Sequence, residues 1–139
     1  MKTVDSDTNL HLGLSEIWLI AGILLAGSAV MLGAFGAHGL KAILSPSALA
    51  TFEVGVRYQM YHGLAIIALS ALVSVVQVTW LNRVAALFVA GCVLFSGSVY
   101  LLSITGSKFF GPITPLGGLL MIIGWIMLLF AVVKGKEND

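Results

Sequence analysis

The chain is patterned as four long apolar runs separated by shorter polar segments. The runs cover residues 17–35, 63–81, 84–105 and 114–133, and none of them contains Asp, Glu, Lys or Arg. Each is close to the roughly 20 residues that a helix needs to cross the hydrocarbon core of a bilayer. Because lipid cannot hydrogen-bond to backbone groups, such runs must be helical. The pattern predicts an all-α integral membrane protein with four transmembrane helices in an antiparallel bundle.

The polar segments suggest the domain organisation. Residues 1–15 form a polar N-terminal extension, residues 16–134 a single four-helix membrane domain, and residues 135–139 a polar tail. A secretory signal begins with a short positive region, whereas here Lys2 is soon followed by Asp5. We therefore expect the first apolar run to remain in the membrane as an anchor.

The loop after the first run carries a further predicted helix, at about residues 46–60. Ser45 followed by Pro46 is typical of a helix N-terminus. Apolar residues recur at helical spacing on one face, while Glu53 and Arg57 form an i,i+4 pair on another. The apolar stripe consists of Leu49, Phe52, Val56 and Met60. This pattern favours an interfacial amphipathic helix at the membrane surface, and a plain polar lead-in to the second span is the alternative.

Composition narrows the classes of function. The mean hydropathy is +1.06, with 59% hydrophobic and 9% charged residues, so the chain falls in the membrane class. A formal net charge of +1 offers no electrostatic footprint for nucleic acid. Cys92 is the only cysteine, which excludes a disulfide within the chain.

The basic residues give a small bias in orientation. Four spans place both termini on one side, which has four of the seven Lys and Arg residues. These are Lys2, Arg83, Lys134 and Lys136, against Lys41, Arg57 and Lys108 on the other side. By the positive-inside rule, this distribution weakly favours cytoplasmic termini.

Polar side chains from all four predicted helices gather on the side opposite the termini. They are His38, Tyr61, His62, Ser96, Tyr100, Ser103, Lys108 and Thr114. Hydrogen bonding between helices is one interpretation, and the lining of a polar pathway is the other. Thr114 also suits the start of the fourth helix, whose N-terminus near Lys108 could attract a lipid phosphate.

Small residues recur at positions where helices could meet. They are Ala29, Gly33, Gly36, Ala37, Gly117 and Gly118. Such residues allow close approach of helix backbones, which drives association in lipid. We interpret them as packing positions, with the lining of a cavity as the alternative.

Metal, haem and hydrolase chemistry lack their usual residue sets. His38 and His62 are expected at the same interface, where they could approach each other, but a zinc or copper site needs three or four ligands. The third histidine, His11, is expected on the other side of the membrane. No carboxylate lies within a span to orient a base beside Ser96. We therefore expect no catalytic residue, no metal and no cofactor.

Four blocks in order along the chain carry a family resemblance. They are GAFGAHGL at 33–40, YQMYHGL at 58–64, LFSGSVYLL at 94–102, and GPITPLGG at 111–118 followed by Gly124 and Trp125. Together they resemble the domain of unknown function 423 family, whose eukaryotic relatives are the transmembrane protein 256-like proteins. The resemblance covers about residues 15–133. It implies a small multipass protein, of the inner membrane in bacteria, and it brings no established activity.

These observations lead to two alternative functions. The first is a non-catalytic accessory or scaffolding subunit that packs against helices of a larger membrane complex, since the loops leave no domain for a soluble substrate. The second is a homo-oligomeric permease for a small solute or lipid, based on the polar cluster. The expected partners are the bilayer and other membrane subunits or further copies of the chain.

Overall fold

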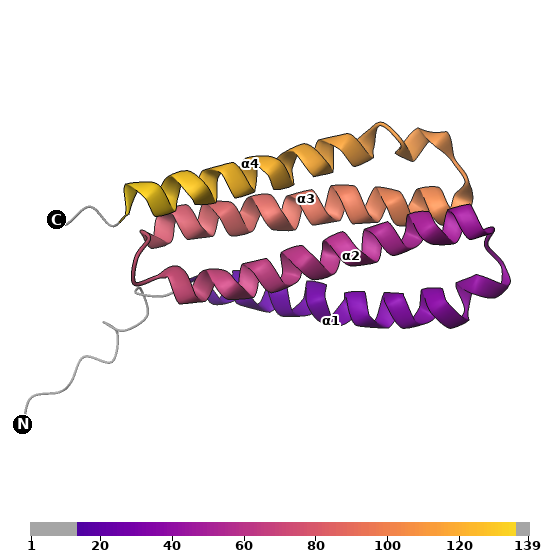
Figure 1. The fold of residues 1–139 in the computed structure, drawn as a ribbon, viewed down its shortest axis with the longest axis horizontal. Helices are drawn as coiled ribbons and strands as arrows, with labels where there is room; N and C mark the ends of the chain where they lie inside the picture. Colours follow the sequence, from indigo (N-terminus) through magenta and orange to yellow (C-terminus); the bar gives the residue numbers. More distant parts are fainter. Residues whose placement is uncertain (1–13, 136–139) are drawn as a thin grey trace, which may run out of the picture.

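The computed structural model describes residues 14–135 and contains four long helices. They are α1 (Glu16–His38), α2 (Pro46–Ala68), α3 (Val78–Thr105) and α4 (Ile113–Lys134). Short 3-10 turns follow the first three helices, at Leu40–Ala42, Leu69–Leu72 and Lys108–Phe110. The helices are antiparallel and lie side by side in chain order, with the start of α1 and the end of α4 at the same end of the molecule (Figure 1). The predicted all-α architecture is confirmed.

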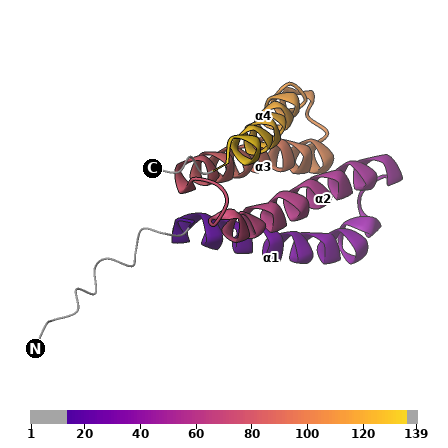
Figure 2. The same cartoon turned by 60° about the vertical axis from the view of Figure 1, so that its left-hand side comes forward.

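Two helical hairpins make up the molecule. One pairs α1 with α2 and the other pairs α3 with α4, and Figure 2 shows the second hairpin lying next to the first. Every extensive interface joins helices that are consecutive in the sequence, so the two hairpins meet mainly through α2 and α3. This places α2 between α1 and α3, where its side chains can reach both.

Three parts of the structure have the length and hydropathy of a membrane span: Glu16–Ala42, Val78–Thr105 and Lys108–Lys134. The 23-residue helix α2 is long enough, at about 1.5 Å per residue, to cross the hydrocarbon core. It is less apolar, because Glu53, Arg57, Gln59 and His62 all lie within it. This helix therefore takes its position from packing beside α1 and α3 rather than from its own hydropathy.

The predicted second span, 63–81, is not a single helix. The chain instead turns at residues 69–77, and 78–81 already belong to α3. The turn is itself apolar, because Leu69 and Val76 are fully buried in the core at the end that holds the termini. A hydropathy pattern therefore does not distinguish the turn from a span. Asn82 and Arg83, which separate the predicted second and third spans, lie on the first turns of α3 instead.

The predicted interfacial helix, 46–60, is also not a separate element. It is the first part of α2 and continues without a break to Ala68. The predicted start is correct, since the Ser45 hydroxyl accepts a hydrogen bond from the Ala48 backbone N–H at 3.2 Å. The helix packs lengthwise against α1 because Phe52, which is 1% exposed, fills the space beside Gly36. A helix lying in the membrane surface could not make that contact.

Glycine allows close contact at two helix crossings. A Cβ added to Gly63 on α2 would lie 2.7 Å from the Ala26 backbone nitrogen on α1. A Cβ added to Gly117 on α4 would collide with the backbone nitrogen of Phe95 on α3. Small residues at such crossings maximise van der Waals contact between helices in lipid.

The α3–α4 crossing can be tested with a single methyl group. We expect Gly117→Ala to lower the free energy of unfolding by about 1–3 kcal/mol, because the added carbon meets backbone rather than a flexible side chain. The measurement is an equilibrium unfolding titration in mixed detergent micelles. Gly97→Ala is the matched control, since nothing lies within 4 Å of its added Cβ. Equal effects of the two substitutions would contradict the close crossing.

Candidate functional site

A buried glutamine on α2 links three helices. Gln59 is 6% exposed. Its Nε2 donates hydrogen bonds to the Leu25 carbonyl at 2.9 Å and to the Ser28 hydroxyl at 2.7 Å, both on α1. Its Oε1 accepts a hydrogen bond from the Tyr100 hydroxyl on α3 at 2.8 Å. One amide group therefore connects α1, α2 and α3 in the interior.

A second contact between α2 and α3 lies one turn away. The Ser96 hydroxyl donates to the Gly55 carbonyl at 2.8 Å. Gly55 has no side chain to obstruct the Tyr100 ring, which would lie 2.6 Å from an added Cβ. The same ring packs on Phe52 with centroids 4.7 Å apart. Together these contacts hold the tyrosine hydroxyl at the glutamine.

A histidine on α2 makes the side-chain link to α4. His62 is 5% exposed, and its Nδ1 lies 2.9 Å from the Tyr58 carbonyl, which can only accept a hydrogen bond. Its Nε2 lies 3.1 Å from the Trp125 indole nitrogen, which can only donate. The imidazole is therefore the neutral tautomer with hydrogen on Nδ1. Its ring also meets the edge of Phe88, with centroids 5.1 Å apart.

The other polar residues of the predicted cluster on α3 and α4 make hydrogen bonds within the α3–α4 hairpin. The Ser98 and Thr114 hydroxyls lie 2.7 Å apart and join α3 to the start of α4. The Ser103 hydroxyl donates to the Val99 carbonyl of its own helix at 2.6 Å. Thr114 also donates to the Phe110 carbonyl at 3.4 Å. These bonds satisfy hydroxyl groups inside the α3–α4 hairpin.

The expected polar cluster is thus only partly assembled. Ser96, Tyr100 and His62 join α2 to its neighbours, whereas His38, Tyr61 and Lys108 are exposed and lie apart from this network. His38 and His62 do not approach each other, because α2 pairs with α1 such that Gly63 lies beside Ala26. At about 1.5 Å per residue, His38 is roughly 18 Å further along α1. The approach of these two histidines, which the sequence left open, is therefore not made.

The predicted packing positions mostly face α2 or α3. Ala29 is fully buried, and a Cβ added to Gly33 would lie 3.3 Å from Val56. Gly36 faces Phe52, and Gly117 faces α3. Ala37 is exposed, and an added Cβ at Gly118 would only reach ordinary contact with the Phe95 ring, at 3.7 Å. The close glycine contacts are therefore made within the chain.

Three residues of this network were not predicted from the sequence as site residues: Ser28, Gln59 and Trp125. The missed signal is the buried stripe of α2, which is Phe52, Gly55, Gln59, His62, Gly63 and Ile66. This stripe has helical spacing, but it includes glycine and polar residues. The stripe through Leu49 and Met60 is entirely apolar, and the sequence pattern therefore favours it as the apolar face of the helix. A polar amide at helical spacing between glycines was the available clue.

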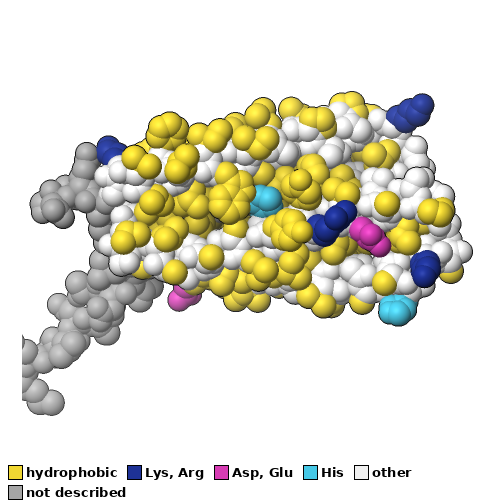
Figure 3. Space-filling view, in the orientation of Figure 1, with side chains coloured by type: hydrophobic (Ala, Val, Ile, Leu, Met, Phe, Trp, Pro, Cys, Tyr) yellow, Lys and Arg dark blue, Asp and Glu magenta, His cyan; other side chains and the backbone are white. Residues whose placement is uncertain are grey.

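The opposite side of α2 carries a second polar feature, which we name the α2 stripe. It consists of Ala50, Glu53, Arg57, Tyr61, Leu64 and Ala68, all of them exposed. Figure 3 shows an adjoining basic and acidic patch on the broad face of the molecule, inside both of its ends and bordered by hydrophobic side chains. Within residues 14–135, neither Glu53 nor Arg57 has an ion-pair partner, including each other. The expected i,i+4 ion pair between Glu53 and Arg57 is therefore not formed.

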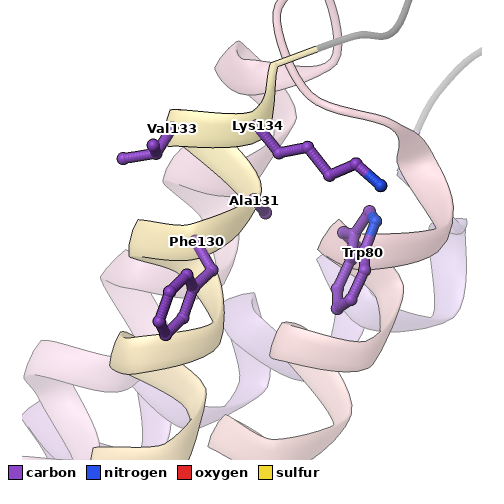
Figure 4. A pocket seen from close by; sticks show the side chains of 5 residues that line it. All are labelled: Trp80, Phe130, Ala131, Val133 and Lys134. Carbon is purple, nitrogen blue, oxygen red and sulfur yellow. The ribbon is translucent and has the colours of Figure 1, made fainter.

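A surface hollow of about 420 Å³ lies between α3 and α4 at the end that holds the termini. It is lined by Trp80, Phe130, Ala131, Val133 and Lys134. Figure 4 shows the Lys134 side chain reaching across the opening toward Trp80. A cation and a tryptophan at the end of apolar helices fit the region where lipid headgroups meet acyl chains.

The polar interior is chemically saturated. In the described part of the chain, every buried side-chain nitrogen or oxygen has a hydrogen-bond partner. Across the same residues, no three His, Cys, Asp or Glu side chains come together as a metal site would require. The hydrogen bonds of Gln59, Ser96 and His62 link neighbouring helices.

The glutamine junction yields a prediction about stability. Gln59→Leu should lower the free energy of unfolding by about 1–3 kcal/mol, because the Tyr100 hydroxyl loses its buried acceptor. Gln77→Leu is the matched control, since Gln77 makes no side-chain capping bond where α3 begins. In a double-mutant cycle with Tyr100→Phe, we expect a coupling of about 0.6–1.7 kcal/mol. Additive effects would show that the two side chains do not interact.

The histidine contact yields a spectroscopic prediction. In membranes, ¹⁵N-labelled His62 should show a protonated Nδ1 and an unprotonated, hydrogen-bonded Nε2. Trp125→Phe removes the indole donor and should shift the Nε2 resonance without changing Nδ1. His38 serves as the internal control, because it is exposed at the end of α1. A His62 protonated on Nε2 would contradict the described contact.

Comparison with known proteins finds relatives that are named membrane proteins. The family model described as protein of unknown function (DUF423) matches residues 32–118. A UPF0382 membrane protein of Staphylococcus aureus (strain bovine RF122) is 44% identical over 119 residues, covering 86% of this chain and 97% of the relative. The UPF0382 membrane protein YwdK of Bacillus subtilis is 45% identical over 126 residues, covering 86% and 98%. No solved structure matches. The chain belongs to the DUF423 family of membrane proteins.

Proposed function

We propose that the chain is a non-catalytic accessory or scaffolding subunit that packs against other helices in the membrane. The observation that supports this most strongly is the α2 stripe. It presents Glu53 and Arg57 on the outside of a molecule whose other helices have apolar exposed faces. Exposed residues of α1 and α4 include Ile23, Leu24 and Phe130, which suit contact with lipid.

The depth of the two charges makes lipid an unfavourable neighbour. Arg57 follows Pro46 by eleven residues, which is roughly 16 Å along α2. Beside it, Val56 packs at Gly33, five residues before the end of α1. The charges thus lie between one and three turns inside the helix ends. A charged residue costs about 2.5–3.5 kcal/mol at the centre of a span and less near the interface. Protein contact would remove this cost.

The saturated interior supports a structural rather than a catalytic role. Gln59 and His62 have both of their polar ends engaged by neighbouring helices. Cys92, the single cysteine, is 1% exposed beneath the Tyr58 carbonyl. A side chain that reacts with a substrate needs a free polar atom facing that substrate. We therefore assign these groups to folding, and we propose that the chain is not an enzyme.

We propose that the protein lies in the bacterial cytoplasmic membrane with both termini toward the cytoplasm. Relatives of the chain in Staphylococcus aureus and Bacillus subtilis are named membrane proteins. The side with the termini has the slight excess of Lys and Arg that the positive-inside rule associates with the cytoplasm. Of those four residues, Lys2 and Lys136 lie outside the described part of the chain.

A permease is the second candidate, and the same stripe favours it. Tyr61 and Arg57 could border a water-filled path between copies of the chain, because both are exposed on one face of α2. This alternative requires flux. Solute or lipid transfer in reconstituted vesicles that Tyr61→Leu abolishes would support a permease over a scaffold.

The scaffold proposal predicts what happens when the two charges of the α2 stripe are replaced by apolar residues. With Glu53→Leu and Arg57→Leu combined, we expect the isolated fold to persist and the assembly to fall apart, because the variant no longer needs a polar partner. Native mass analysis after gentle extraction at normal abundance measures this. Lys41→Leu with Lys108→Leu is the matched control, since it removes two exposed charges from the loops rather than from the stripe.

Two results would contradict the proposal. One is a wild-type chain that runs as a monomer after gentle extraction. The other is a double leucine variant that keeps every partner in the wild-type ratio.

A further inference from the structure

We infer that the α2 stripe is covered by a second copy of this chain, packed in parallel about a two-fold axis along the bundle. This inference rests on the proposed function, because it names the occupant of the same surface. It follows from the arrangement of charges on the stripe. A surface that carries one acid and one base can be complementary to itself, as an isologous interface requires.

The helical positions set the pairing. At about 100° per residue, Glu53 and Arg57 lie roughly 20° to either side of Leu64. If Leu64 faces the two-fold axis, Glu53 of one copy lies on the same side of the seam as Arg57 of the other. The reverse pair forms on the opposite side by symmetry. Charged residues that flank the seam of a parallel coiled coil pair in the same way.

The spacing of Glu53 and Arg57 along the helix allows an ion pair between the two copies. In parallel helices, equal residue numbers lie at equal height, so the paired residues are offset by four positions, or roughly 6 Å. An arginine side chain is long enough to bridge this offset. Since neither charge is ion-paired within residues 14–135, both are available for the contact.

The remaining residues of the stripe fit a helix–helix seam. Ala50 and Ala68 leave room for backbones to approach at its two ends, and Leu64, 53% exposed, supplies apolar area. Membrane orientation also favours this symmetry. Copies inserted the same way can only be related by a two-fold axis along the membrane normal, which brings α2 against α2 in parallel.

Charge reversal tests the reciprocal pairing. Two differently tagged copies are co-expressed, extracted gently, and the fraction that co-purifies is measured. We expect Glu53→Arg alone and Arg57→Glu alone each to reduce self-association at least about tenfold, because like charges then meet twice. Co-expression of the two single variants should restore association, since each of the two pairs is again Arg with Glu. The combined reversal in one chain should restore it as well.

Cross-linking provides a readout that does not depend on charge. In a Cys92→Ser background, Leu64→Cys should form a disulfide between copies on mild oxidation in native membranes, because residue 64 faces its counterpart. Leu119→Cys, 52% exposed on α4, is the control and should remain monomeric. If the charge variants do not fold, this cross-link decides the question.

The outcomes separate this inference from the proposed function. Restoration by complementary variants together with a cross-link at position 64 supports the second copy. Failure of both, while the combined Glu53→Leu and Arg57→Leu variant still loses a different membrane protein, would overturn the second copy and leave the scaffold proposal standing. Failure of both with no partner lost would overturn both.

Discussion

The Gln59 amide is the contact on which the arrangement of the helices depends. Hydrophobicity cannot hold helices together in lipid, because lipid tails are as apolar as the side chains. A buried amide in that environment must find partners, since water is absent. Gln59 finds them on α1 and α3 at the same time, through Leu25, Ser28 and Tyr100. Any shift of α2 along either neighbour would break at least one of these bonds.

Glycine makes this junction possible. The hydrogen bonds require α1, α2 and α3 to approach closely, and close contacts lie one turn to either side of Gln59. Gly55 leaves room for the Tyr100 ring, and Gly63 meets the Ala26 backbone. A methyl group at either position would push the helices apart. The glycines and the amide therefore act as one unit, in which close packing sets the distance and hydrogen bonding sets the register.

Much of this fold could be predicted from the sequence. Hydropathy located α1, α3 and α4, and the Ser45–Pro46 pair located the start of α2. The turn at residues 69–77 could not be found, because Leu69 and Val76 are apolar residues that the core buries. In a membrane protein, a turn can be as apolar as the spans that it joins, so hydropathy alone does not mark it.

The polar site was harder to predict, because sequence shows which side chains are polar but not which way they face. Ser96 and Tyr100 belong to the predicted polar cluster, yet Gln59, which accepts the hydrogen bond of the Tyr100 hydroxyl, does not. Glu53 and Arg57 were correctly placed on one face, but whether that face meets water, lipid or protein depends on how deep α2 lies. The packing of Val56 at Gly33 of α1 sets that depth, and it is a contact between helices that no local sequence pattern contains.

The two sides of α2 have different physical roles, and both follow from its place between α1 and α3. Its inner side carries polar groups whose partners are all within the chain, which fixes the fold. Its outer side carries Glu53 and Arg57, which have no ion-pair partner in residues 14–135. A helix needed only for folding would have an apolar outer side, as α1 and α4 do, because charges there oppose insertion. We therefore propose that the charges on the outer side make a contact outside the single chain.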